Sequence, residues 1–451
     1  MSQAGTTPAA AAVQTGGSAG SDADYPARSY AWSVVALLFA TAVLSYTDRQ
    51  VLSLLVDPIR ADLGISDMQV SLLMGTAFAI VYGTAGILLG SLADRTSRRN
   101  LILAGVVVWS LGTIACGLAH SFNGLFTARI VVGLGEAVLS PASISLISDY
   151  FPPSRRGMAV GCYLSGIAMG VGVSILIGGG VLHVIQMGAL AGTAFAALPA
   201  WRLVLLVIGA PGLLWSLVIL LIREPRRHVA VTATAAGVAG QPAWRSVLRV
   251  QVIPIYLVVA MASLVDNAVG GWAPSLLIRE FGRDPAGIGV QLGLLLTAGF
   301  GGGVLAGGWL ADRAGERGGW SHKLGVCLLS SLVIVPGALL IDAPGFNTVL
   351  LAIPLYFAFS GIVTACGFSA ILDAVPNRSR GLAMGVSFFL NVALGASAGP
   401  AAVSFAGSHV FGAGAGLGPA IAATVSAGYA IAIVALVLTL LRFRNRQPAT
   451  D

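Results

Sequence analysis

Apolar runs long enough to cross a lipid bilayer fill most of this chain. Only 10 % of its 451 residues are charged, where a soluble domain carries about 25 %, and the mean hydropathy is +0.88. The sequence therefore predicts an all-α membrane protein with twelve transmembrane helices of about 20 residues or more. These spans are expected near residues 31–57, 68–92, 100–119, 122–149, 156–185, 201–222, 252–279, 286–310, 322–341, 346–373, 381–406 and 418–441.

The longest polar interruption, residues 223–250, separates the sixth run from the seventh and divides the chain into two sets of six. Residues 1–28 have no basic segment followed by an apolar core, so they are expected to form a flexible tail and not a signal peptide. The predicted units are an N-terminal tail (1–28), an N-terminal six-helix half (29–222), a cytoplasmic linker (223–250), a C-terminal six-helix half (251–441) and a C-terminal tail (442–451).

Basic residues gather in the loops on one side of the predicted spans. Of 25 arginines and lysines, 19 fall in loops on the side of the two termini and 4 on the other side, with Arg49 and Arg129 inside spans. Because cytoplasmic loops carry the excess of positive charge, both termini are expected in the cytoplasm. This distribution accounts for the net charge of +7, so nucleic acid is not an expected partner. A bacterial cytoplasmic membrane is the predicted location.

Two motifs recur at matching places in the two halves. GSLADR at 90–95 returns as GWLADR at 308–313, each closing the second span of its half. DYFPPSRRGMAVG at 149–161 returns as DAVPNRSRGLAMG at 373–385, each between a fourth and a fifth span. A parallel repeat of this kind places a substrate site between the halves near the middle of the membrane.

These motifs resemble those of the major facilitator superfamily, in which G-x-L-A-D-R-x-x-R-R follows the second span. Ser97 stands where that motif has glycine. The sequence is also similar to the spinster branch of the superfamily, in SYTDR at 45–49, ARIVVGLGEA at 128–137 and GGWAPSLL at 270–277. The resemblance implies the major facilitator fold, transport by alternating access, and lysophospholipids or sphingosine phosphate-like lipids as substrates.

Four charged residues lie inside predicted spans. Arg129 and Glu136 are seven residues apart and share one helix face about 10 Å apart, while Asp48 and Arg49 are neighbours in the first span. Each would cost roughly 2.5 kcal/mol or more against lipid, so they are expected to face protein or a water-filled cavity. The resemblance implies that Asp48, Arg129 and Glu136 meet in a central cavity with Arg49 at their edge.

Two interpretations of these charges remain open. They could be fixed ion pairs that dock the first span against the fourth. Alternatively Asp48 and Glu136 carry protons while Arg129 and Arg49 bind an anion, with Arg129 the better anchor for a head group because its planar fork can bind phosphate in two places. Buried ion pairs stabilise poorly compared with apolar packing, which favours the second interpretation.

Other candidate residues lie at span ends and in the second half. The resemblance implies that Asp94, Arg98 and Asp149 form a gating latch; solvated charges are the alternative. Asp266 and Asn267 in the seventh span, with Phe357 and Phe359 in the tenth, are weaker candidates for cavity residues. A hydrated polar patch is the alternative for Asp266.

The sequence favours a proton-coupled secondary transporter for an amphipathic anion. Two alternatives are a proton-linked exporter of drug-like or organic-acid solutes and a non-transporting membrane sensor on the same fold. No nucleotide-binding loop, metal-ligand spacing or catalytic constellation stands out, so the chain is not expected to be an enzyme or to need a cofactor or metal. Its expected partners are a small anionic substrate, protons and membrane lipids, and it is expected to be a monomer.

Overall fold

A computed structural model of the chain describes residues 25–82, 92, 96–190, 192–225, 247–376, 379–412, 414 and 416–443. Within these ranges the protein is helical and contains no strand. Ten of the described helical segments are long and apolar enough to cross a membrane, and a shorter apolar helix covers Asp67–Tyr82. The predicted fold class, an all-α membrane protein, is therefore confirmed.

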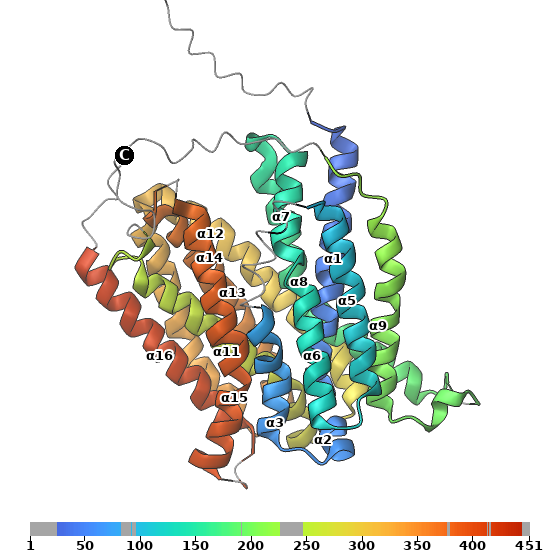
Figure 1. Cartoon of the computed structure of the whole chain (residues 1–451). Coiled ribbons are helices and arrows are strands. Elements are labelled where there is room, and N and C mark those ends of the chain that lie inside the picture. Colours follow the sequence, from blue (N-terminus) through green and yellow to red (C-terminus); the bar gives the residue numbers. More distant parts are fainter. Residues whose placement is uncertain are drawn as a thin grey trace, which may run out of the picture.

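The helices form two groups that lie side by side (Figure 1). The first group, called here the N-terminal half, is α1 (Arg28–Gln50), α2 (Val56–Leu63), α3 (Asp67–Ser71), α5 (Arg98–Leu118), α6 (Phe122–Glu136), α7 (Leu139–Tyr150), α8 (Pro153–Gln186) and α9 (Ala200–Ile219). The second, the C-terminal half, is α11 (Ile253–Phe281), α12 (Pro285–Ala338), α13 (Phe346–Ala374), α14 (Arg380–Leu390), α15 (Ser397–Phe405) and α16 (Gly418–Phe443).

The described helices overlap all twelve predicted spans, with local differences, and the span at 68–92 is described as a helix as far as Tyr82. The spans at 286–310 and 322–341 join in α12, which reverses at Gly318 and Gly319; the φ of 67° at Gly319 favours glycine. The span at 122–149 is interrupted directly after Glu136, where α6 ends. Short π-helical segments interrupt two other spans, at Leu72–Thr76 and at Asn391–Ala396. Such segments often mark functional sites.

The two halves touch closely along α8 and α12 at one end of the molecule. A Cβ atom added at Gly179 would lie 2.7 Å from the Cα of Gly289, and one added at Gly172 would lie 2.3 Å from the Thr297 backbone nitrogen. Only glycine allows the backbones to approach this closely. We call this end the contact end, and the end that carries the basic loops the basic end.

The same two helix faces separate toward the basic end. Gly161 and Gly308 each lie eleven residues, about three turns, beyond Gly172 and Thr297, so they continue the two facing surfaces. A Cβ atom added at either glycine would meet nothing within 4 Å. Between α8 and α12, the interface of the described halves is therefore closed at the contact end and open at the basic end.

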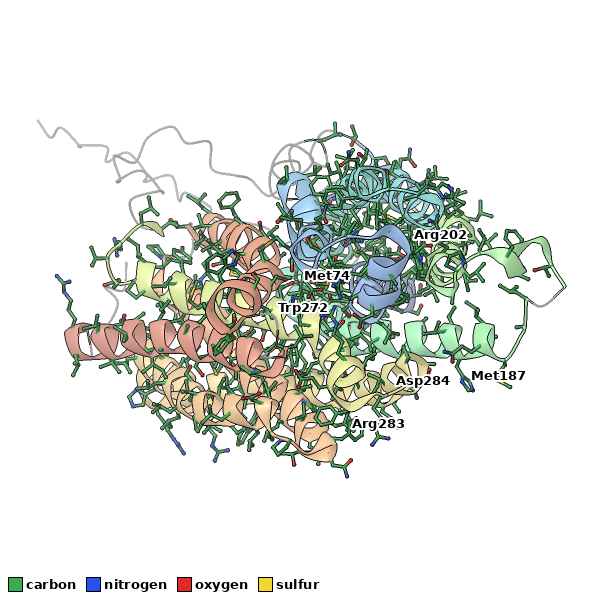
Figure 2. The ribbon with its side chains drawn as sticks, turned by 90° about the horizontal axis from the view of Figure 1, so that it is seen from below. Met74, Met187, Arg202, Trp272, Arg283 and Asp284 are labelled. Carbon is green, nitrogen blue, oxygen red and sulfur yellow. The ribbon has the colours of Figure 1, made fainter. Side chains whose placement is uncertain are left out.

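Ion pairs join the halves at the contact end. Arg279, in the last turn of α11, donates from Nη1 and Nη2 to both carboxylate oxygens of Asp67, at 3.0 and 2.9 Å. Its Nε donates to Asp57 Oδ1 at 2.6 Å. Figure 2 views the molecule from this end, with Met74 of the N-terminal half and Trp272 of α11 near its centre. These ion pairs hold the two halves together at the contact end.

The internal repeat is visible as matching ion pairs at the basic end. Arg98, which begins α5, pairs with Asp149 near the end of α7. Lys323, in the second part of α12, pairs with Asp373 near the end of α13. The two acids begin the repeated motifs at 149–161 and 373–385. Each half therefore has an ion pair between a cation and an acid at the same position of its repeat.

Candidate functional site

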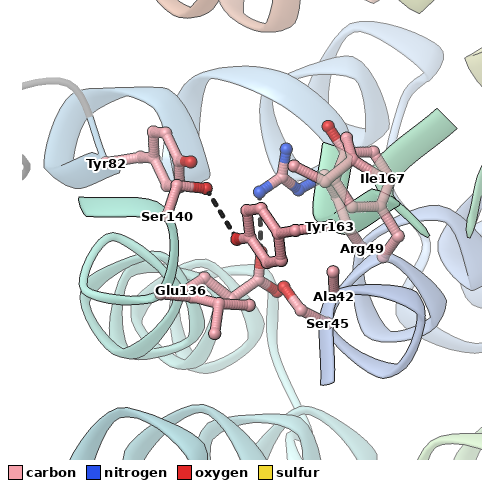
Figure 3. Close-up of a pocket in the computed structure, with 10 residues that line it drawn as sticks. Ala42, Ser45, Arg49, Tyr82, Glu136, Ser140, Tyr163 and Ile167 are labelled. Carbon is pink, nitrogen blue, oxygen red and sulfur yellow. Dashed lines mark hydrogen bonds and ion pairs between the residues drawn. The ribbon is translucent and has the colours of Figure 1, made fainter. Parts of the chain in front are cut away.

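A small pocket lies between α1, the junction of α6 and α7, and α8 (Figure 3). Arg49 and Glu136 supply its charge, and Ser140 and Tyr163, whose hydroxyl oxygens are 3.2 Å apart, supply further polar groups. Its wall consists of Ala42, Ser45, Tyr46, Arg49, Tyr82, Glu136, Leu139, Ser140, Tyr163 and Ile167.

Arg49 and Glu136 form the ion pair of this pocket. Arg49 Nη2 donates to Glu136 Oε2 at 2.7 Å, and the two side chains are 14 % and 0 % exposed. The guanidinium carbon lies 3.9 Å from the ring centre of Phe78, 4.6 Å from that of Tyr46 and 5.2 Å from that of Tyr82. Aromatic faces attract a cation at such distances. The aromatic rings therefore hold the guanidinium at the pocket wall.

Arg129 lies behind the pocket and not on its wall. It is 1 % exposed, and its guanidinium donates to two backbone carbonyl oxygens, those of Leu73 and Asp48, each at 3.3 Å. Leu73 belongs to the π-helical segment at Leu72–Thr76. The structure thus places Arg49 at the pocket and Arg129 in the packing between helices, the reverse of the arrangement expected from the resemblance.

Four polar atoms around this ion pair are buried without a hydrogen-bond partner among the described residues. They are Asp48 Oδ1, Glu136 Oε1, Arg129 Nη2 and Arg49 Nε. Arg129 also interacts electrostatically with Asp48, Glu136 and Arg49. Because an unpartnered buried polar atom is costly, the cluster is under-satisfied in this conformation. It has acceptors available for a proton and donors available for an anion.

The second predicted cluster contains an additional acid. Arg98 pairs with Asp149, and Arg98 Nε also donates to Glu224 at 2.8 Å. Glu224 further accepts hydrogen bonds from the Ser97 hydroxyl and from the backbone N–H groups of Arg98 and Arg99, so it caps the first turn of α5. Asp94 lies outside the described residues, and the predicted latch between the halves stays a prediction.

Glu224 was not identified from the sequence because it follows the sixth span in a loop crowded with arginines. The sequence feature that could have identified it is an acidic residue within a run of arginines, Arg223, Arg226 and Arg227. Burial disfavours its charged form, but the N–H of Arg99 and the guanidinium of Arg98, with Ser97, hold its pKa below the ordinary value. The hydroxyl of Ser97, the departure from the glycine of the motif, contributes one of these bonds.

Replacing Glu224 by Gln should lower the free energy of unfolding by about 1–3 kcal/mol, because charge-assisted hydrogen bonds to a helix start are lost. Thermal unfolding of the purified protein measures this. A lowered pKa stabilises the fold above the ordinary pKa and stops doing so as the pH falls through the lowered value. The wild-type and Glu224→Gln curves should therefore converge in acid. Glu316→Gln, at an exposed acid, is the control; an equal loss there would contradict the assignment.

The weaker candidates of the C-terminal half have different partners, and their place in a cavity stays a prediction. Asp266 Oδ1 accepts hydrogen bonds from Tyr356 and Ser360. The Asn267 amide donates to the carbonyl oxygen of Ser263 on its own helix. Phe357 is buried and Phe359 is partly buried against the core.

Among the described residues, the ion pairs that join the two helical halves lie at one end, and a charged pocket lies inside one half. This is the architecture of a membrane transporter. The sequence model of the Major Facilitator Superfamily matches residues 38–400. The chain belongs to this family.

Relatives support this assignment. The chain is 29 % identical over 377 residues to an MFS-type efflux pump of Mycolicibacterium smegmatis, covering 82 % of this chain and 83 % of that protein. It is 28 % identical to the hexuronate transporter of Bacillus subtilis, covering 82 % and 87 %. Over 196 residues it is 28 % identical to protein spinster of Drosophila melanogaster, covering 44 % and 30 %.

The fold is also similar to a solved structure, that of a bacterial homologue of the human lysosomal transporter spinster in an inward-facing and unoccupied conformation. The TM-score is 0.74 at 26 % identity, covering 92 % of this chain and 96 % of that one. The predicted membership in the major facilitator superfamily and the predicted resemblance to the spinster branch are confirmed.

Proposed function

We propose that the protein is a proton-coupled secondary transporter for an amphipathic anion such as a lysophospholipid or a sphingosine phosphate-like lipid. The observation that carries the proposal is the ion pair between Arg49 and Glu136 on the wall of a buried pocket. An anionic head group can take the place of Glu136 beside Arg49 only if Glu136 gives up its charge or its position. Proton binding and anion binding at this pair are therefore linked.

The direction of access follows from the interface between the halves. We place the basic end in the cytoplasm, because the excess of arginine lies there. The conformation described is then open to the cytoplasm and closed on the opposite side. Alternating access would require the contacts of Arg279 and of α8 with α12 to break while Gly161 and Gly308 approach each other.

The amphipathic character of the substrate is inferred from the surroundings of the ion pair. Arg49 is held against the aromatic rings of Tyr46 and Phe78, and Leu139 and Ile167 belong to the same pocket wall. A ligand with an anionic head and an apolar tail matches a cation set among apolar groups. The resemblance of the sequence motifs to the spinster branch implies the same class of substrate.

A compact organic acid is a second candidate. The hexuronate transporter of Bacillus subtilis matches over most of the chain, and a carboxylate could also bind at Arg49. The hydroxyl groups of Ser140 and Tyr163 near this arginine are groups that a sugar acid could hydrogen-bond. This candidate shares the coupling mechanism and differs only in what fills the pocket.

Uptake into proteoliposomes tests both candidates. We expect a lysophospholipid to accumulate when the outside is more acidic and to stop accumulating when a protonophore removes the gradient. Asp48→Asn and Glu136→Gln each remove one titratable group, so accumulation driven by pH should fall in at least one of them while exchange at equal pH persists. Asp62→Asn, which breaks an ion pair with Arg202 outside the pocket, is the control.

The outcomes separate the candidates. Accumulation of glucuronate without binding of the lysophospholipid would favour the compact acid. Unchanged pH dependence in both Asp48→Asn and Glu136→Gln would show that the two acids are structural.

A further inference from the structure

A further acid, partly buried, lies in the other half, away from the pocket of Arg49. Asp266 is near the middle of α11, so it lies at mid-depth of a membrane-spanning helix. Its Oδ1 atom accepts a hydrogen bond from Tyr356 at 2.7 Å and one from Ser360 at 2.6 Å. Tyr429 of α16 in turn donates to Ser360 Oγ at 2.9 Å. Two hydroxyl groups of α13 thus bind the carboxyl group directly, and a third, from α16, binds one of these two.

Among the described residues, no cation pairs with Asp266. Two other acids in the described spans differ in this respect, because Glu136 has Arg49 and Asp373 has Lys323. A carboxylate that is partly withdrawn from water and has no counter-charge is costly, and binding a proton removes that cost. Hydroxyl groups suit a carboxyl that gains and loses a proton, because they can donate or accept.

In the part of the chain that the structure describes, no other group near Asp266 forms an ion pair with it. Of the helices packed on α11, α13 and α16 present Tyr356 and Tyr429, and α12 contributes Cys327, which interacts with Tyr429. Arg380 begins α14 and donates from Nε to the carbonyl oxygen of Leu372 near the end of α13. Segments Asn391–Ala396 and Ser397–Phe405 contain no ionisable residue.

The charged residues of α11 itself and of the facing half are also distant or engaged. Arg279 and Glu280, on α11 itself, are thirteen and fourteen residues away, about 20 Å along the axis. From the facing half, Gln50 approaches Gly270 one turn further along α11. Its neighbour Arg49 is paired with Glu136.

We propose that Asp266 binds a proton and is a second proton site, separate from Asp48 and Glu136, held by Tyr356, Ser360 and Tyr429. The proton adds to Oδ2, the carboxyl oxygen that receives no hydrogen bond among the described residues, and leaves the same atom on release. Gly270, one turn away, lies where the two halves touch. Rearrangement of that contact during alternating access would change how water reaches Asp266. The site rests on the proposal that transport is coupled to protons.

Infrared spectroscopy of the purified protein tests the site without any substrate. We expect a carbonyl band of a protonated carboxyl group that is missing in Asp266→Asn and disappears reversibly as the pH is raised between about pH 5 and pH 9. Ser360→Ala and Tyr356→Phe each remove one hydrogen bond and should shift the band without abolishing it. Asp373→Asn, which removes an acid paired with Lys323, should leave the band unchanged.

Three results would overturn the proposal. The spectra of wild type and Asp266→Asn could be identical over this range, the band could be insensitive to pH, or sodium chloride could remove it where choline chloride does not, which would identify a sodium site. A failure of the transport proposal is distinguishable, because it would appear as unchanged uptake in Asp48→Asn and Glu136→Gln while the band of Asp266 is still present.

Discussion

Replacing Arg49 by Ala should abolish measurable binding of a lysophospholipid, and Arg49→Lys should weaken it about 10- to 100-fold. The loss corresponds to one or two charge-assisted hydrogen bonds. Lysine keeps the charge, but it lacks the planar fork that contacts Glu136 and lies against Phe78. Titration of the purified protein with the lipid, followed by intrinsic fluorescence, measures the effect.

Arg129→Lys is the matched comparison. Arg129 donates to the backbone carbonyl oxygens of Leu73 and Asp48, so its replacement should lower thermal stability more than it lowers affinity. The double variant Arg49→Ala/Glu136→Gln removes both charges of the pair. It is a control for misfolding, because it leaves no Glu136 carboxylate without its partner. If Arg129→Lys abolished binding while Arg49→Lys did not, the head group would bind at Arg129, as the sequence suggested.

The fold was predictable because its signal is long and repeated. Apolar runs of about 20 residues identify spans, and the motif repeat at 149–161 and 373–385 relates the two halves through their residues alone. The interruptions within spans were not predictable. The junction after Glu136 and the π-helical segment at Leu72–Thr76 occur in stretches as apolar as the rest, because tertiary packing determines where such helices deviate.

The sequence predicted which residues belong to the candidate site but not how their side chains are arranged. Charge inside an apolar run shows that a residue avoids lipid, and this identified Asp48, Arg49, Arg129 and Glu136. It does not show which way a side chain points. Neighbouring residues on a helix differ by about 100°, so small differences in helix rotation decide whether Arg49 or Arg129 faces the pocket.

Glu224 illustrates a related limit. A surface loop rich in charge looks solvated in the sequence, and only the fold brings this acid to the first turn of α5, more than 100 residues away. Asp266 looked equally isolated. Its partners Tyr356, Ser360 and Tyr429 come from the tenth and twelfth spans, and their convergence depends on how α13 and α16 pack against α11.

Replacing Arg279 by Gln should shift the protein away from the conformation described and toward one that is closed at the basic end. Arg279 is the ion-paired link between the halves at the contact end, through Asp57 and Asp67. Its side chain is 24 % exposed, so solvent weakens the link, and a loss of about 1–2 kcal/mol is expected. That loss changes the ratio of the two conformations about 5- to 30-fold.

Disulfide cross-linking reports the shift. Cysteines introduced at Gly161 and Gly308, in a background with Cys162→Ser, lie on the faces that separate at the basic end and should cross-link only when that end closes. We expect Arg279→Gln to raise the yield, and Asp67→Asn to do the same because it breaks the link from the other side. High salt should raise the yield of the wild type for the same reason.

Two control variants at the same end show whether the yield rises because a link between the halves is broken or only because a charge is removed. Arg283→Gln removes an exposed arginine that lies over the ring of Phe346 within the C-terminal half. Asp62→Asn breaks the pair with Arg202 within the N-terminal half. Neither pair crosses the interface, so neither variant should change the yield. Equal yields in Arg279→Gln and Arg283→Gln would mean that Arg279 does not hold the contact end closed, and that other contacts between the halves do so, such as those of α8 with α12 and of Ser71 with Pro400 and Ser404.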